Sequence, residues 1–461
     1  MLNKPLRPIS VILYATSCLG IVYLLLHPQL ADLVLSRPLY GYSIVLYFIS
    51  TILVSVIVGR STLYSPSLFL LVFFIAVPLL GPMSARQYFD HFGSYFGRSM
   101  PSFEFPTFLY SVGTVSFFGG VLLGWLLLPK SKRNALVLWD HRRMVLLLSV
   151  SLVMATLGTM LALSRIGYVP LLKFDISDVR VDYFKAVGPL ASRFSQHWPV
   201  PALLASMLFF LGKGKKKYIY LCITIICAMG TLLYAQRTGF VWVISAFGLM
   251  YFKFSRPRLL RLLAVAGIAL VLVYGLLIQV EYRSGFFAAD SENRLLKHAF
   301  PEWSQYSIVV NEARSGSKYL GWKIFVGPFF TLVPRQIYSL LGQDKGALML
   351  EYSAVYYYGR EFDEPYGIRV TPIGEAFAAY GVSGVILQML VLGVVFGALE
   401  RAYFGLDKCD ARLCLVCYGL SLMTHLPITT MFVLLVPLTV TGVFVAAYYF
   451  YGTRKCQVVA V

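Results

Sequence analysis

Long apolar runs alternate with shorter polar segments along most of this chain. Each run is near the length of about 20 residues that an α-helix needs to cross the hydrocarbon core of a bilayer. The runs are continuous and lack the two-residue alternation of membrane β-strands. They predict twelve transmembrane helices, at residues 9–26, 39–59, 66–82, 107–128, 143–163, 198–212, 218–234, 238–252, 262–280, 373–399, 413–428 and 431–451. We therefore expect an all-α polytopic membrane protein in which residues 1–461 form a single integral membrane domain.

The division between the runs at 218–234 and 238–252 rests on one short segment. Only the sequence "AQRTG" (Ala235–Gly239) separates them. The alternative is one long helix that carries a buried charge at Arg237.

Composition and the placement of charge agree with a membrane protein. Hydrophobic residues make up 58% of the chain and charged residues 13%, about half the charged fraction of soluble domains. The net charge of +19 could indicate a nucleic-acid partner. However, the basic residues cluster in short loops, with five in 129–143, four in 212–217 and four in 253–261. By the positive-inside rule these loops and both termini are cytoplasmic, and no nucleic-acid partner is predicted.

Two long polar segments fall on the opposite, external side, at residues 164–197 and 281–372. A loop as long as the second is usually functional, and we expect short or re-entrant helices within it. It is rich in aromatic residues, including Tyr319 and Trp322. Aromatic rings can stack on the C–H faces of sugars, which makes these two residues candidate substrate contacts. The alternative is a belt of aromatic side chains at the membrane interface.

Several common catalytic motifs are missing from the sequence. It contains no phosphate-binding G-x-x-x-x-G-K-[ST] loop, no H-E-x-x-H and no G-x-S-x-G. We expect no metal site and no cofactor. Cys414 and Cys417 have a spacing seen in metal sites, but they lie in an apolar run without a second pair of ligands and are interpreted as buried core cysteines.

Basic residues near the external ends of apolar runs are the candidate phosphate ligands, because guanidinium groups match phosphate geometry with two parallel hydrogen bonds. Each has a simpler interpretation, as a side chain that reaches the headgroups, is solvated or is paired locally. The set consists of Arg237, Arg283, Arg314, Arg335 and Lys345.

Glu375 is the candidate catalytic residue. It follows Thr371, which suits a helix N-cap, and Pro372, which suits the first helical position. A carboxylate in a first helical turn stabilises the helix dipole by about 0.3–1 kcal/mol, which is the simpler interpretation. The alternative is that Glu375 orients or deprotonates a reacting group of a substrate.

With these features the chain resembles the bacterial oligosaccharide repeat-unit polymerases, the Wzy-type O-antigen and exopolysaccharide polymerases. The resemblance covers most of the chain in topology and is sharper from about residue 235 to 384. Its motifs are "AQRTG" at 235–239, "FPEW" at 300–303, "YLGW" at 319–322, "LVPRQIY" at 332–338 and "TPIGEAFAAYGVSG" at 371–384. The "NFG" familiar after the Gly-Glu pair reads "AYG" at 379–381 here.

The resemblance implies a membrane glycosyltransferase architecture of the GT-C type, located in the bacterial inner membrane. Oligosaccharide repeat units carried on undecaprenyl pyrophosphate would be the substrates and would be joined without a metal ion. Membrane lipid and a chain-length regulator protein would be the other partners. The alternatives are an O-antigen ligase, a lipid-linked oligosaccharide flippase and a structural partner of an export complex. The polymerase, the ligase and the flippase differ in which form of the glycan accumulates when the protein is lost.

Overall fold

The computed structural model describes part of the chain, namely residues 37–60, 65–78, 81–82, 102–127, 137–170, 194–195, 197–233, 237–255, 302–316, 319–324, 326, 335–340, 370–424, 426, 446–447 and 449–455. The chain divides into two compact units, each made of three stretches of sequence. The first unit contains Met1–Lys130, Asn293–Phe404 and Met423–Val436, and the second contains Ser131–Glu292, Gly405–Leu422 and Pro437–Val461.

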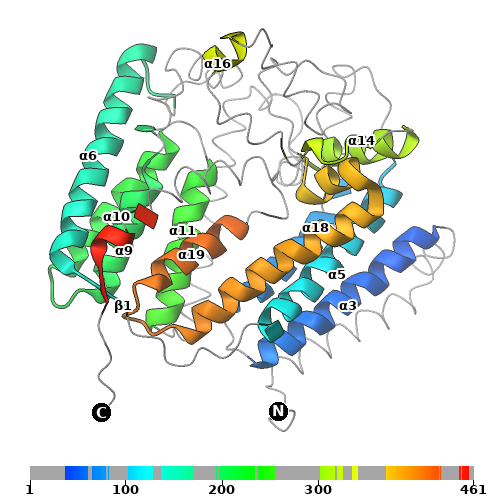
Figure 1. Cartoon of the computed structure of the whole chain (residues 1–461), viewed down its shortest axis with the longest axis horizontal. Helices are drawn as coiled ribbons and strands as arrows, with labels where there is room; N and C mark the ends of the chain where they lie inside the picture. The colour runs from blue at the N-terminus through cyan, green and yellow to red at the C-terminus, as the bar shows by residue number, and fades with distance from the viewer. Residues whose placement is uncertain are drawn as a thin grey trace, which may run out of the picture. The chain divides into compact units, whose positions relative to one another are not determined.

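The described residues are almost entirely helical, as predicted (Figure 1). The elements are α3 (Pro38–Arg60), α5 (Glu104–Leu127), β1 (Val137–Trp139), α6 (His141–Ile166), α9 (Pro199–Leu211), α10 (Lys217–Leu232), α11 (Arg237–Ser255), α14 (Glu302–Ser315), α16 (Arg335–Leu340), α18 (Pro372–Gly405), α19 (Arg412–Met423) and β2 (Thr453–Lys455).

Four of the described helices, α3, α5, α6 and α18, are long and apolar enough to cross a membrane. Shorter apolar helices occupy Pro66–Pro78, Pro199–Leu211, Lys217–Leu232, Gly239–Ser255 and Arg412–Met423. The structure thus supports a membrane protein but does not confirm the predicted number of twelve spans. The predicted spans at 9–26 and 262–280, and most of 431–451, lie outside the described residues.

The uncertain division near Ala235 is settled in favour of two helices. Helix α10 ends at Leu232 and α11 begins at Arg237, and the two helices pack against each other. The alternative of a single long helix with a buried arginine is therefore wrong.

Helices α5 and α18 of the first unit meet along a line of glycines. A side chain at Gly120 would overlap the carbonyl oxygen of Leu390, and one at Gly393 would overlap the carbonyl oxygen of Phe117. The same relation repeats one turn further along, at Gly124 and Gly397. Small residues let two helix backbones approach closely, and this close approach is a main source of helix association inside lipid.

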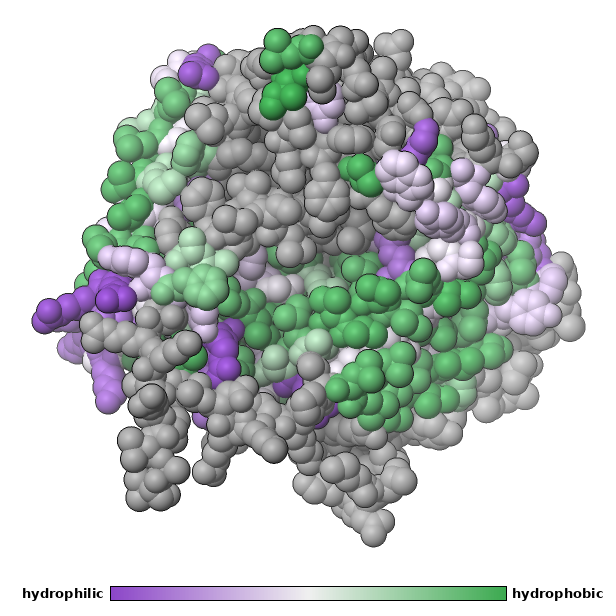
Figure 2. Space-filling model, in the orientation of Figure 1, coloured by the Kyte–Doolittle hydropathy of each residue, from purple (hydrophilic) through white to green (hydrophobic). Residues whose placement is uncertain are grey.

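The opposite face of α18 is apolar and exposed. Its side chains include Leu387, which is 67% exposed, and Val391, which is 51% exposed. Figure 2 shows this hydrophobic surface running along α18, with further hydrophobic surface over α3. Such a surface is expected where a helix contacts lipid chains rather than water.

A buried carboxylate fixes the C-terminal end of α18. Glu400 is fully buried and accepts hydrogen bonds from the Ser65 hydroxyl (2.5 Å), from the amide (2.9 Å) and hydroxyl (2.5 Å) of Ser67, and from Trp125 Nε1 (3.0 Å). Ser65 and Ser67 lie at the start of the helix Pro66–Pro78, and the N-terminus of a helix favours negative charge. Glu400 therefore joins α18 to this helix and to α5.

The second unit holds a two-stranded antiparallel ladder that an all-α fold does not include. Strand β1 pairs with β2, with Leu138 opposite Arg454. The Val137 carbonyl accepts a hydrogen bond from the Ala411 amide at 2.8 Å, and Lys408 Nζ donates to the Phe254 carbonyl at 2.7 Å. Through the segment 408–411, these bonds join β1, β2 and Phe254, which lie in three segments that the basic-residue pattern places on one side of the membrane.

The glycine contact between α5 and α18 leads to a prediction with a matched control. Gly120→Ala places a methyl group on the Leu390 carbonyl, whereas a methyl group at the adjacent Gly119 meets nothing within 4 Å. We expect Gly120→Ala to destabilise the protein by about 1–3 kcal/mol and Gly119→Ala to be neutral or stabilising. Thermal unfolding in detergent measures both, and equal melting temperatures for the two variants would contradict the packing.

Candidate functional site

The N-terminal end of α18 forms as the sequence predicts. The Thr371 hydroxyl accepts a hydrogen bond from the Gly374 amide at 3.3 Å. The Thr371 carbonyl accepts the first hydrogen bond of the helix, from the Glu375 amide, at 3.0 Å. Pro372 is the first residue of the helix. Thr371 is therefore the N-cap, and Glu375 lies in the first turn.

Helix α18 covers the predicted span 373–399, but it is broken at Tyr380 and Gly381. Their φ/ψ angles are −142°/23° and 64°/−149°, and the second pair is accessible almost only to glycine. Gln388 Nε2 donates to the Pro372 carbonyl at 3.3 Å although 16 residues separate them. In a straight helix that separation is about 24 Å. The segment 372–379 is therefore a short helix that folds back along the longer helix 382–405.

The break leaves carbonyl groups without hydrogen-bond donors from the helix. A segment of the predicted external loop supplies donors for two of them. The Leu320 amide donates to the Ala378 carbonyl at 3.0 Å, and the Gly321 amide donates to the Ala379 carbonyl at 2.9 Å. Ser383 Oγ donates to the Tyr380 carbonyl at 2.8 Å. A broken helix persists in an apolar environment only when its freed backbone groups are satisfied in this way.

Helix α14 supports the short helix, and it lies within the segment 281–372. Tyr306 donates its hydroxyl proton to the Pro106 carbonyl at 2.8 Å, and its ring lies so close to Gly374 that a side chain there would clash. A small apolar core joins the same elements. Its members are Val309, Ile324, Val370, Ala378 and Ala379.

An aromatic series connects two of the predicted site residues, Arg314 and Tyr319, by way of the short helix that carries Glu375. The Arg314 guanidinium lies 4.3 Å from the ring centroid of Phe105. Phe105 contacts Phe377, with centroids 5.5 Å apart, and Phe377 contacts Tyr319 at 6.0 Å. Phe377 lies two residues after Glu375, which is only 7% exposed. Arg314, Tyr319 and the short helix that carries Glu375 therefore belong to one local assembly.

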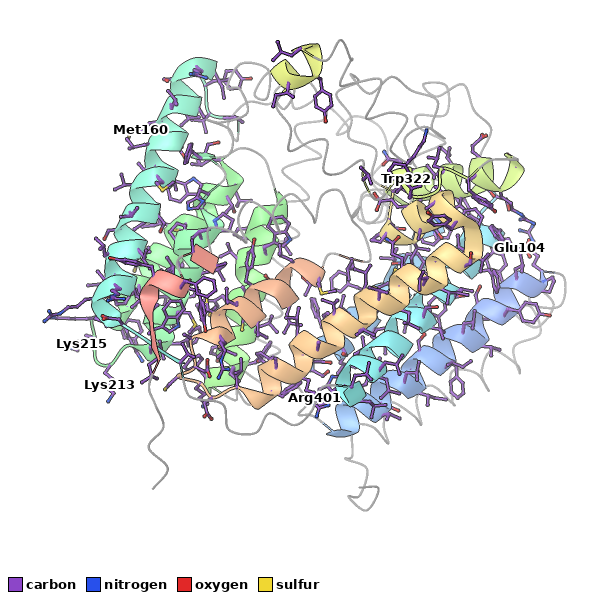
Figure 3. All side chains as sticks on the ribbon, in the orientation of Figure 1. Glu104, Met160, Lys213, Lys215, Trp322 and Arg401 are labelled. Carbon is purple, nitrogen blue, oxygen red and sulfur yellow. The ribbon has the colours of Figure 1, made fainter. Side chains whose placement is uncertain are left out.

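Trp322 belongs to the same assembly. It follows the segment that bonds to the break, and it is 58% exposed. Figure 3 shows it beside the N-terminal part of α18, at the end of the helix opposite to Arg401.

The structure leaves the convergence of the basic residues untested. Arg237 begins α11 and Arg335 begins α16, but their side chains are not among those described. Arg283 and Lys345 lie outside the described residues. A shared phosphate site for these four residues stays a prediction. Among the described residues no three His, Cys, Asp or Glu side chains gather as metal ligands would, and Cys414 and Cys417 are buried, as expected.

Sequence reasoning missed the residues that build the site around Glu375. These are Phe105, Phe377 and Tyr380. Phe377 and Tyr380 lie inside the predicted span 373–399, and Phe105 lies just before the predicted span 107–128. One signal for the break was present, because Gly381 and Gly384 interrupt an apolar run, and isolated glycines within such a run often mark a special backbone position.

Comparisons of the chain with protein-family models, with curated proteins and with solved structures each find no match. The site therefore has to be interpreted from its own chemistry.

The break gives a testable prediction at Gly381. Any side chain there meets both a positive φ angle and the Tyr319 hydroxyl, 3.0 Å from the position of a Cβ atom. We expect Gly381→Ala to cost about 1–3 kcal/mol of stability. Gly405→Ala, at the other end of the same helix, meets nothing within 4 Å and serves as the control in the same unfolding measurement. If Gly381→Ala unfolds no more easily than Gly405→Ala, the broken geometry is incorrect.

Proposed function

We propose that this protein is a membrane glycosyltransferase that joins oligosaccharide repeat units carried on undecaprenyl pyrophosphate into a surface polysaccharide. The observation that carries the proposal is the setting of Glu375. A nearly buried carboxylate lies in the first turn of a short, folded-back helix, and an aromatic series links that helix to an exposed arginine and an exposed tyrosine.

In the proposed reaction, a hydroxyl of one repeat unit attacks the anomeric carbon of a chain held on lipid pyrophosphate. The new glycosidic C–O bond forms as the bond from the anomeric carbon to the pyrophosphate oxygen breaks. The hydroxyl proton passes to the Glu375 carboxylate, and undecaprenyl pyrophosphate leaves with the electron pair. A positioned general base contributes about 10²–10⁴-fold to such a step.

Cationic groups would stabilise the negative charge that develops on the departing pyrophosphate. Arg314 is exposed, and its guanidinium is held over the Phe105 ring, which limits its motion without using its hydrogen-bond donors. Arg237, Arg283, Arg335 and Lys345 are the further candidates for this role. Charges arranged in advance are often the largest catalytic contribution, and they would supply it without a metal ion.

The proposed setting is the outer face of a bacterial inner membrane, with both termini in the cytoplasm. The hydrogen-bonded group formed by β1, β2, Ala411, Lys408 and Phe254 supports one part of this arrangement. It brings together the C-terminal strand and loops assigned to the cytoplasm by their basic residues. A chain-length regulator is a further proposed partner.

Glu375→Gln separates the two interpretations of this carboxylate. If it acts on the acceptor hydroxyl, the variant protein inserts and folds normally, while lipid-linked repeat units stay unpolymerised. Glu312→Gln, at an exposed carboxylate on α14, should polymerise at the wild-type rate. The measurement is the length distribution of the glycan made from purified lipid-linked repeat units. Wild-type polymer from Glu375→Gln would leave only the helix-dipole role.

Substitutions of Arg314 test the phosphate interaction. We expect Arg314→Ala to lower the polymerisation rate by about 10- to 100-fold, because the loss of a charge-assisted hydrogen bond costs about 1.5–3 kcal/mol. Arg314→Lys should recover only part of the rate, since an ammonium group lacks the planar two-donor geometry. Arg165→Ala, at an exposed arginine near the end of α6, is the control. Equal rates for Arg314→Ala and this control would exclude Arg314 from the site.

A further inference from the structure

Three large aromatic side chains stay exposed at the break in α18. Tyr319 is 48% exposed, Trp322 is 58% exposed and Tyr380 is 46% exposed. Other aromatic residues of the same region, such as Phe377 and Tyr306, are buried in its core. The three exposed side chains gather where the loop segment 319–322 bonds to the helix.

The two tyrosines are arranged reciprocally around two glycines. The Tyr319 hydroxyl lies 3.0 Å from where a Cβ atom of Gly381 would be. Ring and hydroxyl atoms of Tyr380 lie 3.9 Å from where a Cβ atom of Gly321 would be. Both glycines have positive φ angles, 64° at Gly381 and 63° at Gly321. Each ring therefore lies over a part of the backbone that carries no side chain, and it is held there while about half of its surface remains open.

This arrangement suits a sugar ring. A pyranose presents a face of C–H groups, which packs on an aromatic face, and a rim of hydroxyl groups, which need hydrogen-bond partners. Tyr and Trp combine an apolar ring with a polar group at its edge. The hydroxyl of Ser383, two residues beyond Gly381, is also exposed. Lipid chains would make no use of these polar groups.

We propose that Tyr319, Trp322 and Tyr380 form a subsite for one pyranose ring of the oligosaccharide substrate. The contact of Tyr319 with Phe377 places this subsite next to the turn that carries Glu375. The inference rests on the proposed function and deepens it, because it assigns the part of the protein that holds the sugar rather than the lipid pyrophosphate. It also gives the broken helix a purpose, which is to turn these rings outward.

The test uses free repeat-unit oligosaccharide, released by mild acid from the lipid-linked pool of the producing strain, and the purified full-length protein in nanodiscs. Saturation-transfer NMR measures which sugar protons contact the protein and how tightly the oligosaccharide binds. We expect Tyr319→Leu, Trp322→Leu and Tyr380→Leu each to weaken binding by about three- to tenfold. Tyr319→Phe and Tyr380→Phe should lose less, because they keep the ring.

Tyr42→Leu is the matched control, since Tyr42 lies on α3 of the same unit and is 59% exposed. Equal binding by the three leucine variants and the wild type, or an equal loss in Tyr42→Leu, would overturn the subsite. Quenching of Trp322 by lipids brominated near the headgroup, without quenching by aqueous acrylamide, would also overturn it and assign the rings to a membrane-interface belt.

The same preparation separates this inference from the proposed function. Sugar binding that depends on the three rings, in a protein that does not polymerise lipid-linked units, would keep the subsite and reject the polymerase. Normal polymerisation by all three leucine variants would keep the polymerase and reject the subsite.

Discussion

The site depends on one constraint, which is that backbone groups away from water need hydrogen-bond partners. A break inside an apolar helix exposes several of them at once. Here the Leu320 and Gly321 amides donate to the Ala378 and Ala379 carbonyls, and these hydrogen bonds stabilise the broken helix. The loop segment and the short helix are consequently fixed together, and Tyr319 and Glu375 are held in one assembly by the backbone before any side chain is considered.

The remainder of the first unit keeps that assembly in place. The long part of α18 packs through Gly393 against α5, and Glu400 ties its far end to α5 and to the helix Pro66–Pro78. Helix α5 also carries Phe105, which lies between Arg314 and Phe377. The site is thus built on two helices that are fixed to each other along much of their length, which is the kind of support that the proposed catalytic role of Glu375 requires.

The sequence predicted those features that depend on local chemistry. The membrane class, the two separate helices α10 and α11, the cap at Thr371 and the place of Glu375 all followed from composition, helix length and the preferences of single residues. The break at Gly381 did not, because a continuous helix satisfies the same apolar pattern. Choosing between the two forms requires knowing that residues 320 and 321, about sixty positions earlier, donate to the freed carbonyls. The grouping of Arg314, Phe105 and Phe377 is likewise a tertiary contact between separate segments.

The most direct test of this account is a distance across the break. Cysteines at positions 372 and 388, in a background without the native cysteines, can be treated with a cross-linker of about 10 Å in native membranes. The folded-back geometry, in which Gln388 Nε2 is 3.3 Å from the Pro372 carbonyl, predicts efficient intramolecular cross-linking. A continuous helix would separate the two positions by about 24 Å, and the absence of any cross-link would contradict the account.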